Sequence, residues 1–377
     1  MLRYMTAGES HGKALMAILD GVPAGLKIDE GVINEDLLRR MHGYGRGGRM
    51  AIELDMVDIV AGVRKQITIG SPLGLMVKNN DYKINELPDV VTPRPGHADL
   101  AGIQKYNLHD ARDVLERASA RETAARVAVG AVAKLILQEF KIRTLSHVTM
   151  LGGIEADTNG LSFDELLSLT DVEKSPVRCA DKEAEKKMCD LIDKTRKEGD
   201  TLGGAVEVIV DNVPVGLGTH VQWDRRLDGA LSRALMSVQA VKAVSIGDGI
   251  ENAGNPGSSV HDPIEYMKKT KEYSRLTNHA GGIEGGMTNG APVVAKVFMK
   301  PIATLMNALD TVDINTKKKT KAATERSDVS AVAACGVVAE AVVAIEIASA
   351  LIDKFGGDSI SEMKRNHESY VKALKEA

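Results

Sequence analysis

The segment 116–126, of sequence ERASARETAAR, places three arginines and two small hydroxyl groups directly before a long apolar helical pattern at 127–137. A guanidinium group keeps its charge at any working pH, and its planar fork of N–H donors matches a carboxylate or a phosphate. Arginines grouped at a helix start therefore indicate an anionic ligand, and free helix N-terminal amides would strengthen the attraction. The alternative is a solvent-exposed helix start in which Glu122 pairs with Arg126.

The spacing of these arginines limits what they can do together. At about 100° per residue of a continuous helix, Arg117 and Arg121 share a face, and Arg126 lies across the helix from Arg117. We therefore expect that the three cannot all contact one small ligand, and that some of them are structural.

Two histidines lie in loops that glycine and proline keep out of regular helices. His11 stands in the turn 8–12 (GESHG), and His97 in the loop 92–99 (TPRPGHAD). Glycine allows close ligand approach, and the prolines exclude a helix interior. Imidazole gains and loses protons near neutral pH. We predict that both histidines are acid–base groups, against the alternative that they are polar surface residues in turns.

The densest basic cluster is the segment 39–49 (RRMHGYGRGGR), which contains no acidic residue. Its glycines match the dinucleotide-binding pattern G-x-G-x-x-G, but that pattern should follow a strand, whereas this one follows a helical pattern at 35–41. We interpret it as a mobile loop that clamps a polyanionic small molecule. The rival interpretation, an RGG-like nucleic-acid segment, is disfavoured by its single tyrosine and by the net charge of -4 of the whole chain.

The composition is that of a globular protein with a large core. The chain has 377 residues, 44% of them hydrophobic and 27% charged. Three cysteines without metal-ligand spacing predict a reduced cytoplasmic protein with no bound metal, and the N-terminus does not read as a signal peptide. The segment 329–352 is long enough to span a bilayer, but it contains Glu340 and Glu346, so we expect a buried central helix and no membrane association.

An internal similarity organises the chain. Residues 209–217 (IVDNVPVGL) match 18–26 (ILDGVPAGL) at six of nine positions. Three weaker similarities follow in the same order: the predicted helices 35–41 and 227–236, the loops 96–99 and 278–281, and the apolar helices 124–137 and 329–352. This pattern predicts a single domain, 1–377, of two related halves, approximately 1–200 and 201–377, with a site where loops of the halves converge.

Two motifs of the second half also have chemical potential. The glycine-rich segment 278–290 would hold a phosphate or the edge of a flavin with free backbone amides, or it is a hairpin without a ligand. The segment 325–328 (ERSD) opens the final apolar helix, where Ser327 or Asp328 would serve as N-cap.

Together these motifs resemble the chorismate synthase family over essentially the whole chain. The resembling segments, in the family's order, are 8–12, 40–49, 94–99, 117–123, 278–286, 300–301 and 326–328. The resemblance implies a carbon–oxygen lyase of the shikimate pathway, which forms chorismate by anti-1,4-elimination of phosphate from 5-enolpyruvylshikimate 3-phosphate. It also implies reduced FMN without net redox change, an α+β (mixed α/β) fold with central helices between antiparallel-rich sheets, and a homotetramer.

The resemblance further assigns roles to individual residues. His11 would protonate the flavin or the departing phosphate, His97 would supply a proton to the flavin system, and Asp328 would relay the proton taken up near the flavin N5, in competition with its capping role. Family FMN positions are Arg117, Ala118, Ser119, Gln239, Ala240, Gly285, Lys300, Pro301, Ile302, Ala303, Thr304 and Arg326. Positions for the substrate or for NADPH are Ser10, Arg40, Arg46, Arg49 and Arg126.

The implied substrate explains why cations gather in an acidic protein. It carries two carboxylates and a phosphate, and removing that much negative charge from water requires fixed positive partners. Two questions stay open at this point. FMN could be reduced by NADPH on this chain or by a partner reductase, and a different FMN enzyme with net redox chemistry would consume reduced flavin.

Overall fold

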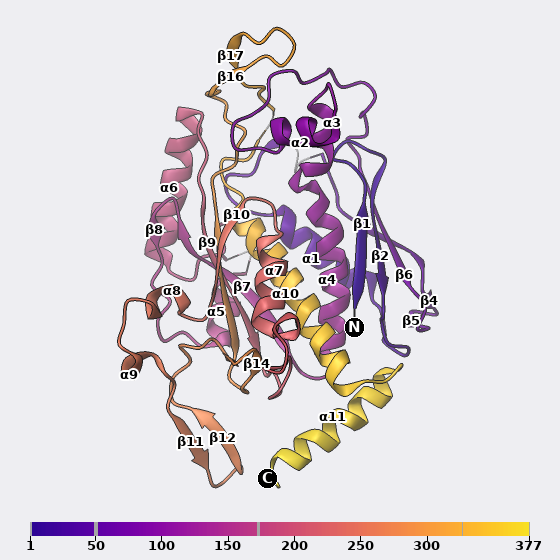
Figure 1. Ribbon diagram of the computed structural model, residues 1–377, viewed down its shortest axis with the longest axis vertical. Coiled ribbons are helices and arrows are strands. Elements are labelled where there is room, and N and C mark those ends of the chain that lie inside the picture. Colours follow the sequence, from indigo (N-terminus) through magenta and orange to yellow (C-terminus); the bar gives the residue numbers. More distant parts are fainter. Residues whose placement is uncertain (1, 49–51, 172–173, 326, 377) are drawn as a thin grey trace.

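Two antiparallel sheets enclose a layer of helices in the computed structural model, which describes residues 2–48, 52–171, 174–325 and 327–376 (Figure 1). The first sheet has the strand order β1 (Arg3–Ala7), β2 (Ala14–Asp20), β6 (Leu73–Lys78), β3 (Val57–Ala61). The second has the order β10 (Val241–Ile246), β15 (Val293–Met299), β9 (Gly204–Asp211), β7 (Arg143–Leu151), β8 (Ile154–Glu155). This confirms the predicted mixed α/β fold with central helices between antiparallel sheets.

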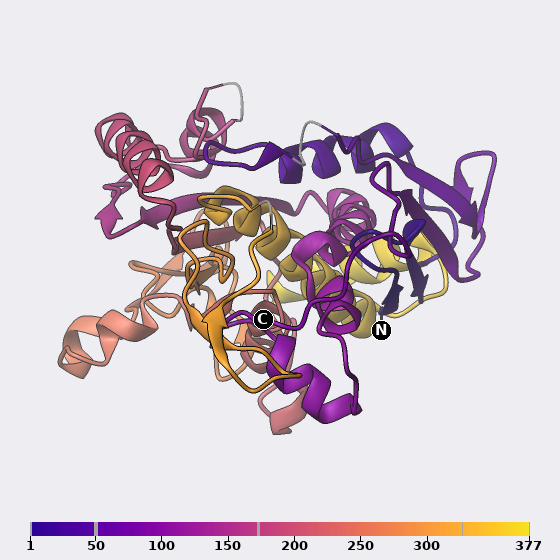
Figure 2. The same ribbon diagram turned by 90° about the horizontal axis from the view of Figure 1, so that it is seen from above.

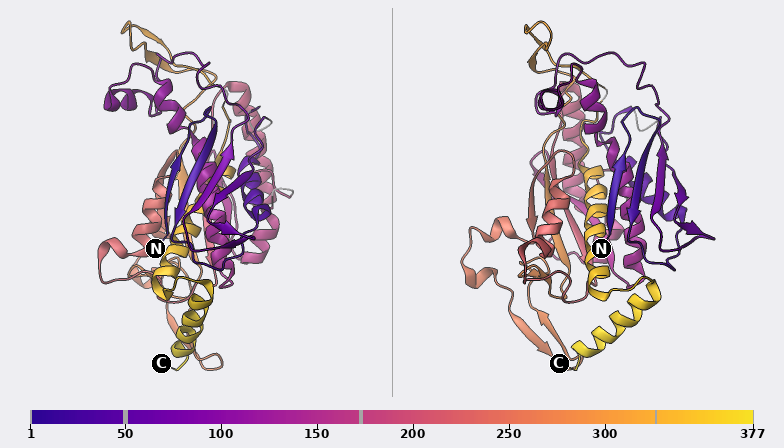
Figure 3. Two further views of the ribbon diagram at one scale, coloured as in Figure 1. Left: turned by 90° about the vertical axis from the view of Figure 1, so that its right-hand side faces the viewer. Right: turned by 45° about the vertical axis from the view of Figure 1, so that its right-hand side comes forward.

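The strands carry one buried and one more exposed face. Buried residues alternate with accessible ones in β2 and in β15, as expected when one face of a sheet packs on helices and the other does not. Figure 3 shows the two sheets on opposite sides of the central helices. The alternation of the sequence therefore determines which face of each sheet contacts the helical layer.

Two helices, α4 (Thr123–Gln138) and α10 (Val332–Phe355), form the centre of this layer. Every α4 residue from 123 to 137 except Arg126 is buried, and so is every α10 residue from 332 to 345. By length and composition α10 would be able to cross a membrane, but 83% of its most apolar window is buried inside the protein. A helix that is apolar on all sides belongs in a core, so the prediction of a buried central helix at 329–352 is confirmed.

Close contact between these helices depends on small side chains. A Cβ atom added to Gly130 of α4 would lie 2.4 Å from the Ala341 Cβ and 2.6 Å from its Cα. Gly130→Ala should therefore lower the free energy of unfolding by about 1–3 kcal/mol through overpacking, despite the better helix propensity of alanine. Urea unfolding measures the change. Gly229→Ala, at an exposed and open helical position, is the matched control and should be neutral or stabilising.

The remaining helices surround this centre. The predicted helix 227–236 is present as α7 (Leu227–Met236), and a further long helix is α6 (Lys182–Glu198). The helix predicted at 35–41 begins earlier, because the Asp29 side chain accepts a hydrogen bond from the Gly31 amide and caps α1 (Glu30–Met41). The others are α2 (Asp99–Tyr106), α3 (Arg112–Ala118), α5 (Phe163–Leu169), α8 (Gly249–Asn252), α9 (Gly257–Val260) and α11 (Ile360–Leu374).

Short strand pairs complete the fold. The two-stranded pairs are β4 (Val63–Arg64) with β5 (Ile67–Thr68), β11 (Ile264–Met267) with β12 (Glu272–Arg275), β13 (Ile283–Glu284) with β14 (Met287–Thr288), and β16 (Asp310–Val312) with β17 (Lys319–Lys321). The glycine-rich segment 278–290 thus contains a hairpin, β13–β14.

The two sheets are built in the same chain order. Apart from elements inserted between them, the first series is β1, β2, α1, β3, β4, β5, β6, α4, and the second is β7, β9, α7, β10, β13, β14, β15, α10. The sheet order β1, β2, β6, β3 corresponds to the order β7, β9, β15, β10. In segment 18–26, the Thr68 hydroxyl donates to the Pro23 carbonyl at 2.6 Å and accepts from the Leu26 amide at 2.9 Å. In segment 209–217, the Thr288 hydroxyl donates to the Pro214 carbonyl at 2.6 Å and accepts from the Leu217 amide at 2.8 Å. We propose that the halves are related repeats and that the second begins at β7, not near residue 201.

A small lobe lies at one end of the molecule. The lobe consists of two connections that pack together (Figure 2). One runs from β6 to α4 and contains α2 and α3, and the other runs from β15 to α10 and contains β16 and β17. A separate apolar cluster of Val90, Ile103 and Ala111 holds the lobe together, with Ile314 and Ala323 packed against it. The lobe therefore places loops from both halves next to the end of the helical layer.

Candidate active site

A cavity of about 430 Å³ lies where the lobe meets the turn after β1. Several predicted positions converge on it from four segments of the chain. Those that line it are Ser10, His11, His97, Ser119, Ile302, Ala303 and Thr304. The sequence-based expectation of a site made of loops distant in sequence remains an interpretation, but these seven residues do share one cavity.

A buried carboxylate orients His11. Glu116, only 3% exposed, accepts from the His11 amide at 2.7 Å and lies 2.8 Å from its Nδ1 atom. A carboxylate that only accepts hydrogen bonds keeps the imidazole proton on Nδ1. Burial alone would raise the pKa of Glu116, but the hydrogen bonds from His11 hold it below its ordinary value. The Nε2 atom, 3.7 Å from Asp81, is therefore the one that can exchange protons in the cavity.

His97 is held in the same way. Its Nδ1 lies 2.5 Å from the fully buried Asp99, which also accepts from Arg94 at 2.9 Å. Arg94 in turn donates to the Thr304 hydroxyl at 2.8 Å. Burial opposes ionisation of Asp99, but hydrogen bonds from His97 and Arg94 hold its pKa well below the usual range. The cavity thus has two imidazoles, each oriented by a buried carboxylate.

The charge of Glu116 can be tested separately from its shape. Glu116→Gln should lower turnover about tenfold, because a glutamine amide can turn its N–H₂ toward Nδ1 and stabilise the wrong imidazole tautomer. The ¹⁵N chemical shifts of His11 in the ligand-free protein would report the tautomer directly. Unchanged shifts and unchanged turnover would contradict the orienting role, and Glu116→Asp should recover part of the activity.

The segment 116–126 is not one helix. The helix α3 ends at Ala118, Ser119 is extended, and the 3₁₀ turn η2 (Ala120–Glu122) leads into α4. The Ser119 hydroxyl accepts from the amide of Arg121 and so begins a new turn. The expected shared face of Arg117 and Arg121 is therefore wrong.

The three arginines of this segment have separate partners. Arg117 donates to the Thr6 and Gly8 carbonyls at 3.0 and 3.1 Å and is exposed. Arg126 pairs with Glu122 at 3.0 Å, as the alternative interpretation expected, and reaches the Ser237 hydroxyl at 2.8 Å. Some of these arginines are therefore engaged within the protein.

Three buried guanidinium groups at or near the cavity have nitrogen atoms without a hydrogen bond. Arg40 and Arg121 share the carboxylate of Asp55 at 2.7 and 2.5 Å. Within the described part of the chain, the Arg40 Nε, the Arg121 Nη2 and the Arg112 Nη1 are buried without a hydrogen-bond partner, although the Arg121 Nη2 lies 3.6 Å from Glu53 and the Arg112 Nη1 lies 3.7 Å from Glu116. Because an unpaired buried donor costs about 1–3 kcal/mol, such donors indicate a missing acceptor.

Arg94, Arg112 and Arg121 were not among the predicted binding residues. Arg112 lines the cavity and pairs with Glu325 at 3.0 Å. The sequence does not show which arginines have a buried nitrogen without a hydrogen bond, because that depends on the residues around each side chain in the folded protein. The RPGHAD motif contains Arg94 and the segment 116–126 contains Arg121, so both arginines lie in motifs that the sequence singled out, whereas Arg112 lies in neither.

Asp328 does not cap α10. That helix begins at Val332 after Ala331, which makes no side-chain capping bond, so the capping prediction is wrong for both Ser327 and Asp328. The Asp328 carboxylate instead accepts from the Gly47 amide at 2.6 Å and pairs with Arg46 at 3.2 Å. It ties the arginine-rich loop to the chain before α10. The predicted positions Arg49 and Arg326 lie outside the described residues.

Other predicted FMN positions lie beside or away from the cavity. Burial and the charge of Lys242 lower the pKa of Lys300, and within the described part of the chain no carboxylate pairs with it. Gln239 donates to Glu122 at 3.1 Å, and its Oε1 is buried without a partner. The residues that do not line the cavity are Arg117, Ala118, Gln239, Ala240, Gly285, Lys300 and Pro301. Gly285 lies in the β13–β14 turn, toward the end of the molecule opposite the lobe (Figure 1).

Comparison with known proteins identifies the family. The family described as chorismate synthase matches residues 2–352. The chain is 52% identical to a chorismate synthase of Syntrophotalea carbinolica, over 98% of this chain and 97% of the relative, and 52% identical to one of Geobacter metallireducens, over the whole of both chains. A crystal structure of chorismate synthase superposes with a TM-score of 0.83 at 42% identity, covering 100% of this chain and 99% of the other. The chain therefore belongs to the chorismate synthase family, whose members are carbon–oxygen lyases.

Proposed function

We propose that this protein converts 5-enolpyruvylshikimate 3-phosphate to chorismate by anti-1,4-elimination of phosphate, with reduced FMN and without net redox change. The observation that carries the proposal is the pair of imidazoles, His11 and His97, each oriented by a buried carboxylate toward one cavity. Membership of the chorismate synthase family supports it. We also propose that the protein is cytoplasmic and that it binds neither nucleic acid nor a membrane.

The cationic surroundings of the cavity fit a substrate with two carboxylates and a phosphate. Spare donors of Arg40, Arg112 and Arg121 are already buried, so an anion can replace missing acceptors without new desolvation of these groups. We assign the substrate or NADPH to Ser10, Arg40, Arg46, Arg49 and Arg126. Because Arg126 is engaged by Glu122 and Ser237, it would act through that pair.

The residues present also fit FMN. A half-buried lysine without a carboxylate partner suits a phosphate, and the buried Gln239 Oε1 is an acceptor for a flavin N–H group. Residues that would hold the cofactor include Arg117, Ser119, Lys300 and Thr304, together with the other family positions named above. When bound, reduced FMN supplies electron density as phosphate leaves and recovers it as hydrogen is lost, which matters because that hydrogen is not acidic.

The side chains of this chain supply binding and proton transfer. His11 donates a proton from Nε2 on the side of the departing phosphate, while Glu116 keeps Nδ1 protonated. His97 supplies a proton to the flavin side, and Asp99 with Arg94 fixes its ring. Asp328 acts as the proton relay, with its carboxylate positioned by Arg46 and the Gly47 amide.

A homotetramer is part of the proposal, and the outer face of the first sheet supports self-association. Met5, Met16 and Ile18 lie on this face and are 75%, 44% and 55% exposed. Contiguous exposed apolar side chains on a sheet are unusual for a monomer. Gly285 lies in the β13–β14 turn, toward the end of the molecule opposite the lobe. It would therefore contact FMN only in the cavity of another copy of the chain. Sedimentation velocity would measure the mass.

Anaerobic phosphate release from 5-enolpyruvylshikimate 3-phosphate tests the reaction. The assay is run with catalytic FMN, either oxidised or photoreduced, and we expect many turnovers with reduced FMN only. Release in proportion to flavin oxidation would indicate a different FMN enzyme with net redox chemistry. No release from folded, FMN-bound protein would mean that the site serves another substrate. Adding NADPH to oxidised FMN then shows whether this chain reduces its own flavin.

A further inference from the structure

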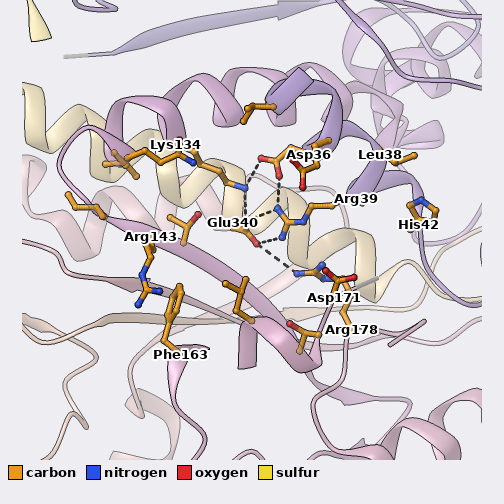
Figure 4. A pocket seen from close by; sticks show the side chains of 18 residues that line it. Asp36, Leu38, Arg39, His42, Lys134, Arg143, Phe163, Asp171, Arg178 and Glu340 are labelled. Carbon is orange, nitrogen blue, oxygen red and sulfur yellow. Dashed lines mark hydrogen bonds and ion pairs between the residues drawn. The ribbon is translucent and has the colours of Figure 1, made fainter. Parts of the chain in front are cut away.

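A second cleft opens beside α1, α5 and β7, away from the candidate active site (Figure 4). Its volume is about 630 Å³, larger than the active-site cavity, and the two share no lining residue. The size is within the usual range for small-molecule sites. Its floor is formed by charged side chains of α1, α4 and α10 that the proposed reaction does not use.

Two carboxylates on this floor are shared among three cations. Glu340 of α10 accepts two hydrogen bonds of 3.0 Å from Arg39 and one of 2.5 Å from Lys134. Asp36 contacts the same Arg39 and Lys134 at 2.5 and 2.7 Å. The charged ends of these side chains converge in Figure 4. The third cation, Arg178, is 3.9 Å from Glu340.

Arg178 is the least compensated member of the group. It is only 4% exposed, donates to the Ser146 carbonyl at 2.6 Å, and has a buried Nε atom without a hydrogen-bond partner. Its backbone is left-handed, with φ of 58°, which is costly for a residue other than glycine. Burial and the charge of Arg39 lower the pKa of Arg178 to about 10, although the carboxylates of Glu340, Asp36 and Asp171 act in the opposite direction. A buried cation in this state would gain from one more anion.

The walls of the cleft combine polar side chains with exposed apolar ones. Leu38 and Leu167 are each 46% exposed, and both line it. Phe163 also lines it, with the Arg143 guanidinium 4.4 Å from its ring centre. Figure 4 shows Phe163 and Leu38 on opposite sides of the charged floor, and Phe163 and Leu167 lie one turn apart on α5. The ring and Leu167 provide a surface for an apolar group, while the floor provides a site for a negative charge.

We propose that this cleft binds a small organic carboxylate, with its charged group at the floor near Arg178 and its apolar body against Phe163 and Leu167. The ligand gives Arg178 a direct carboxylate partner, closer than Glu340 at 3.9 Å, and covers the exposed Leu167. The site is independent of the elimination reaction.

Calorimetric titration of the full chain with 3-phenylpropanoate tests the proposal. This probe has one carboxylate and one phenyl ring, and its neutral analogue 3-phenylpropanamide has the same shape without the charge. We expect one molecule of the carboxylate per chain, with a dissociation constant of about 1 mM or lower, and at least tenfold weaker binding of the amide. Inorganic phosphate should bind more weakly than 3-phenylpropanoate.

Arg178→Met and Arg112→Met are matched variants, since each removes a buried arginine with one unpartnered nitrogen from one of the two cavities. Arg178→Met should weaken 3-phenylpropanoate binding about tenfold or more, and Arg112→Met should leave it unchanged. Leu38→Asp adds a negative charge at an exposed helical position, so it should keep the fold and also weaken binding.

Three results would overturn the proposal. The first is no binding of 3-phenylpropanoate to the folded protein. The second is binding that Arg112→Met abolishes but Leu38→Asp does not affect, which would place the probe in the active site. The third is equal binding of phosphate or of the amide, which would remove the requirement for an apolar body or for a charge.

Discussion

Replacing His11 by alanine should slow phosphate release by roughly 10²-fold or more while leaving the fold and FMN binding nearly unchanged. The size of the effect is that of a lost acid–base group, because the imidazole is the side chain that Glu116 orients toward the cavity. The ring makes no contribution to the apolar core. Turnover under anaerobic conditions, circular dichroism and an FMN titration separate the three quantities.

His109→Ala is the matched control for this variant. His109 is exposed on the lobe and does not line the cavity, so its removal should leave turnover near normal. Near-normal turnover of His11→Ala would remove the proton-transfer role. Equal losses in both variants would indicate that the lobe, and not one imidazole, was disturbed.

Glu340→Gln should lower the free energy of unfolding at pH 7 by about 3–5 kcal/mol. Glutamine keeps the volume but removes the charge that Arg39 and Lys134 share, and leaving buried cations without their counter-charge is strongly destabilising. Arg178 would lose its nearest carboxylate as well. Urea unfolding followed by circular dichroism measures the difference from the natural chain.

The loss of stability caused by Glu340→Gln should become smaller as the pH falls. Burial disfavours the charged form of Glu340, but the charges of Arg39 and Lys134 outweigh it and hold the pKa well below the ordinary value of 4.5. A carboxyl group with a lowered pKa in the folded state stabilises the fold above its ordinary pKa and loses that contribution as the pH falls. The gap between the natural chain and Glu340→Gln should therefore narrow below about pH 4.5.

Glu346 on the same helix provides the control. Burial raises the pKa of Glu346, and its nearest cation, Arg233, is 3.9 Å away. Glu346→Gln should therefore change stability by less than about 0.5 kcal/mol or increase it slightly. A small loss in Glu340→Gln that does not vary between pH 7 and pH 4 would show that the shared carboxylate adds little.

The buried helix at 329–352 could be predicted from a local pattern, because apolar residues on all sides are a property of one window of sequence. The arrangement of helices between two antiparallel sheets came from the resemblance to the family, because pairing between distant strands leaves no signal in a short window. The predicted boundary of the halves near residue 201 came from one strong similarity at 209–217. In the repeat proposed above, that similarity would mark the second strand of a unit, and the first strand would be β7, which carries no recognisable copy of β1 in its sequence.

The site was predicted by residue type and family pattern but not in its contacts. The histidines could be selected because their loops are unusual, whereas Glu116 and Asp99 owe their roles to burial. The break at Ser119 was missed because its neighbours all favour a helix, and one hydroxyl-to-amide bond decides the geometry. Asp328 looked like a cap because capping depends on where the helix starts, three residues later than expected.

The proposed relation between the halves has a consequence for the two connections that meet at the lobe. If the halves are repeats, each connection occupies the same place in its own unit. Because both units lie in one chain, the two connections can differ in sequence while the scaffolds stay alike. One connection now carries His97 and the other Thr304 and Asp328, while the threonines at 68 and 288 still hold both scaffolds in the same shape. New substrates would therefore be reached by changing one loop at a time.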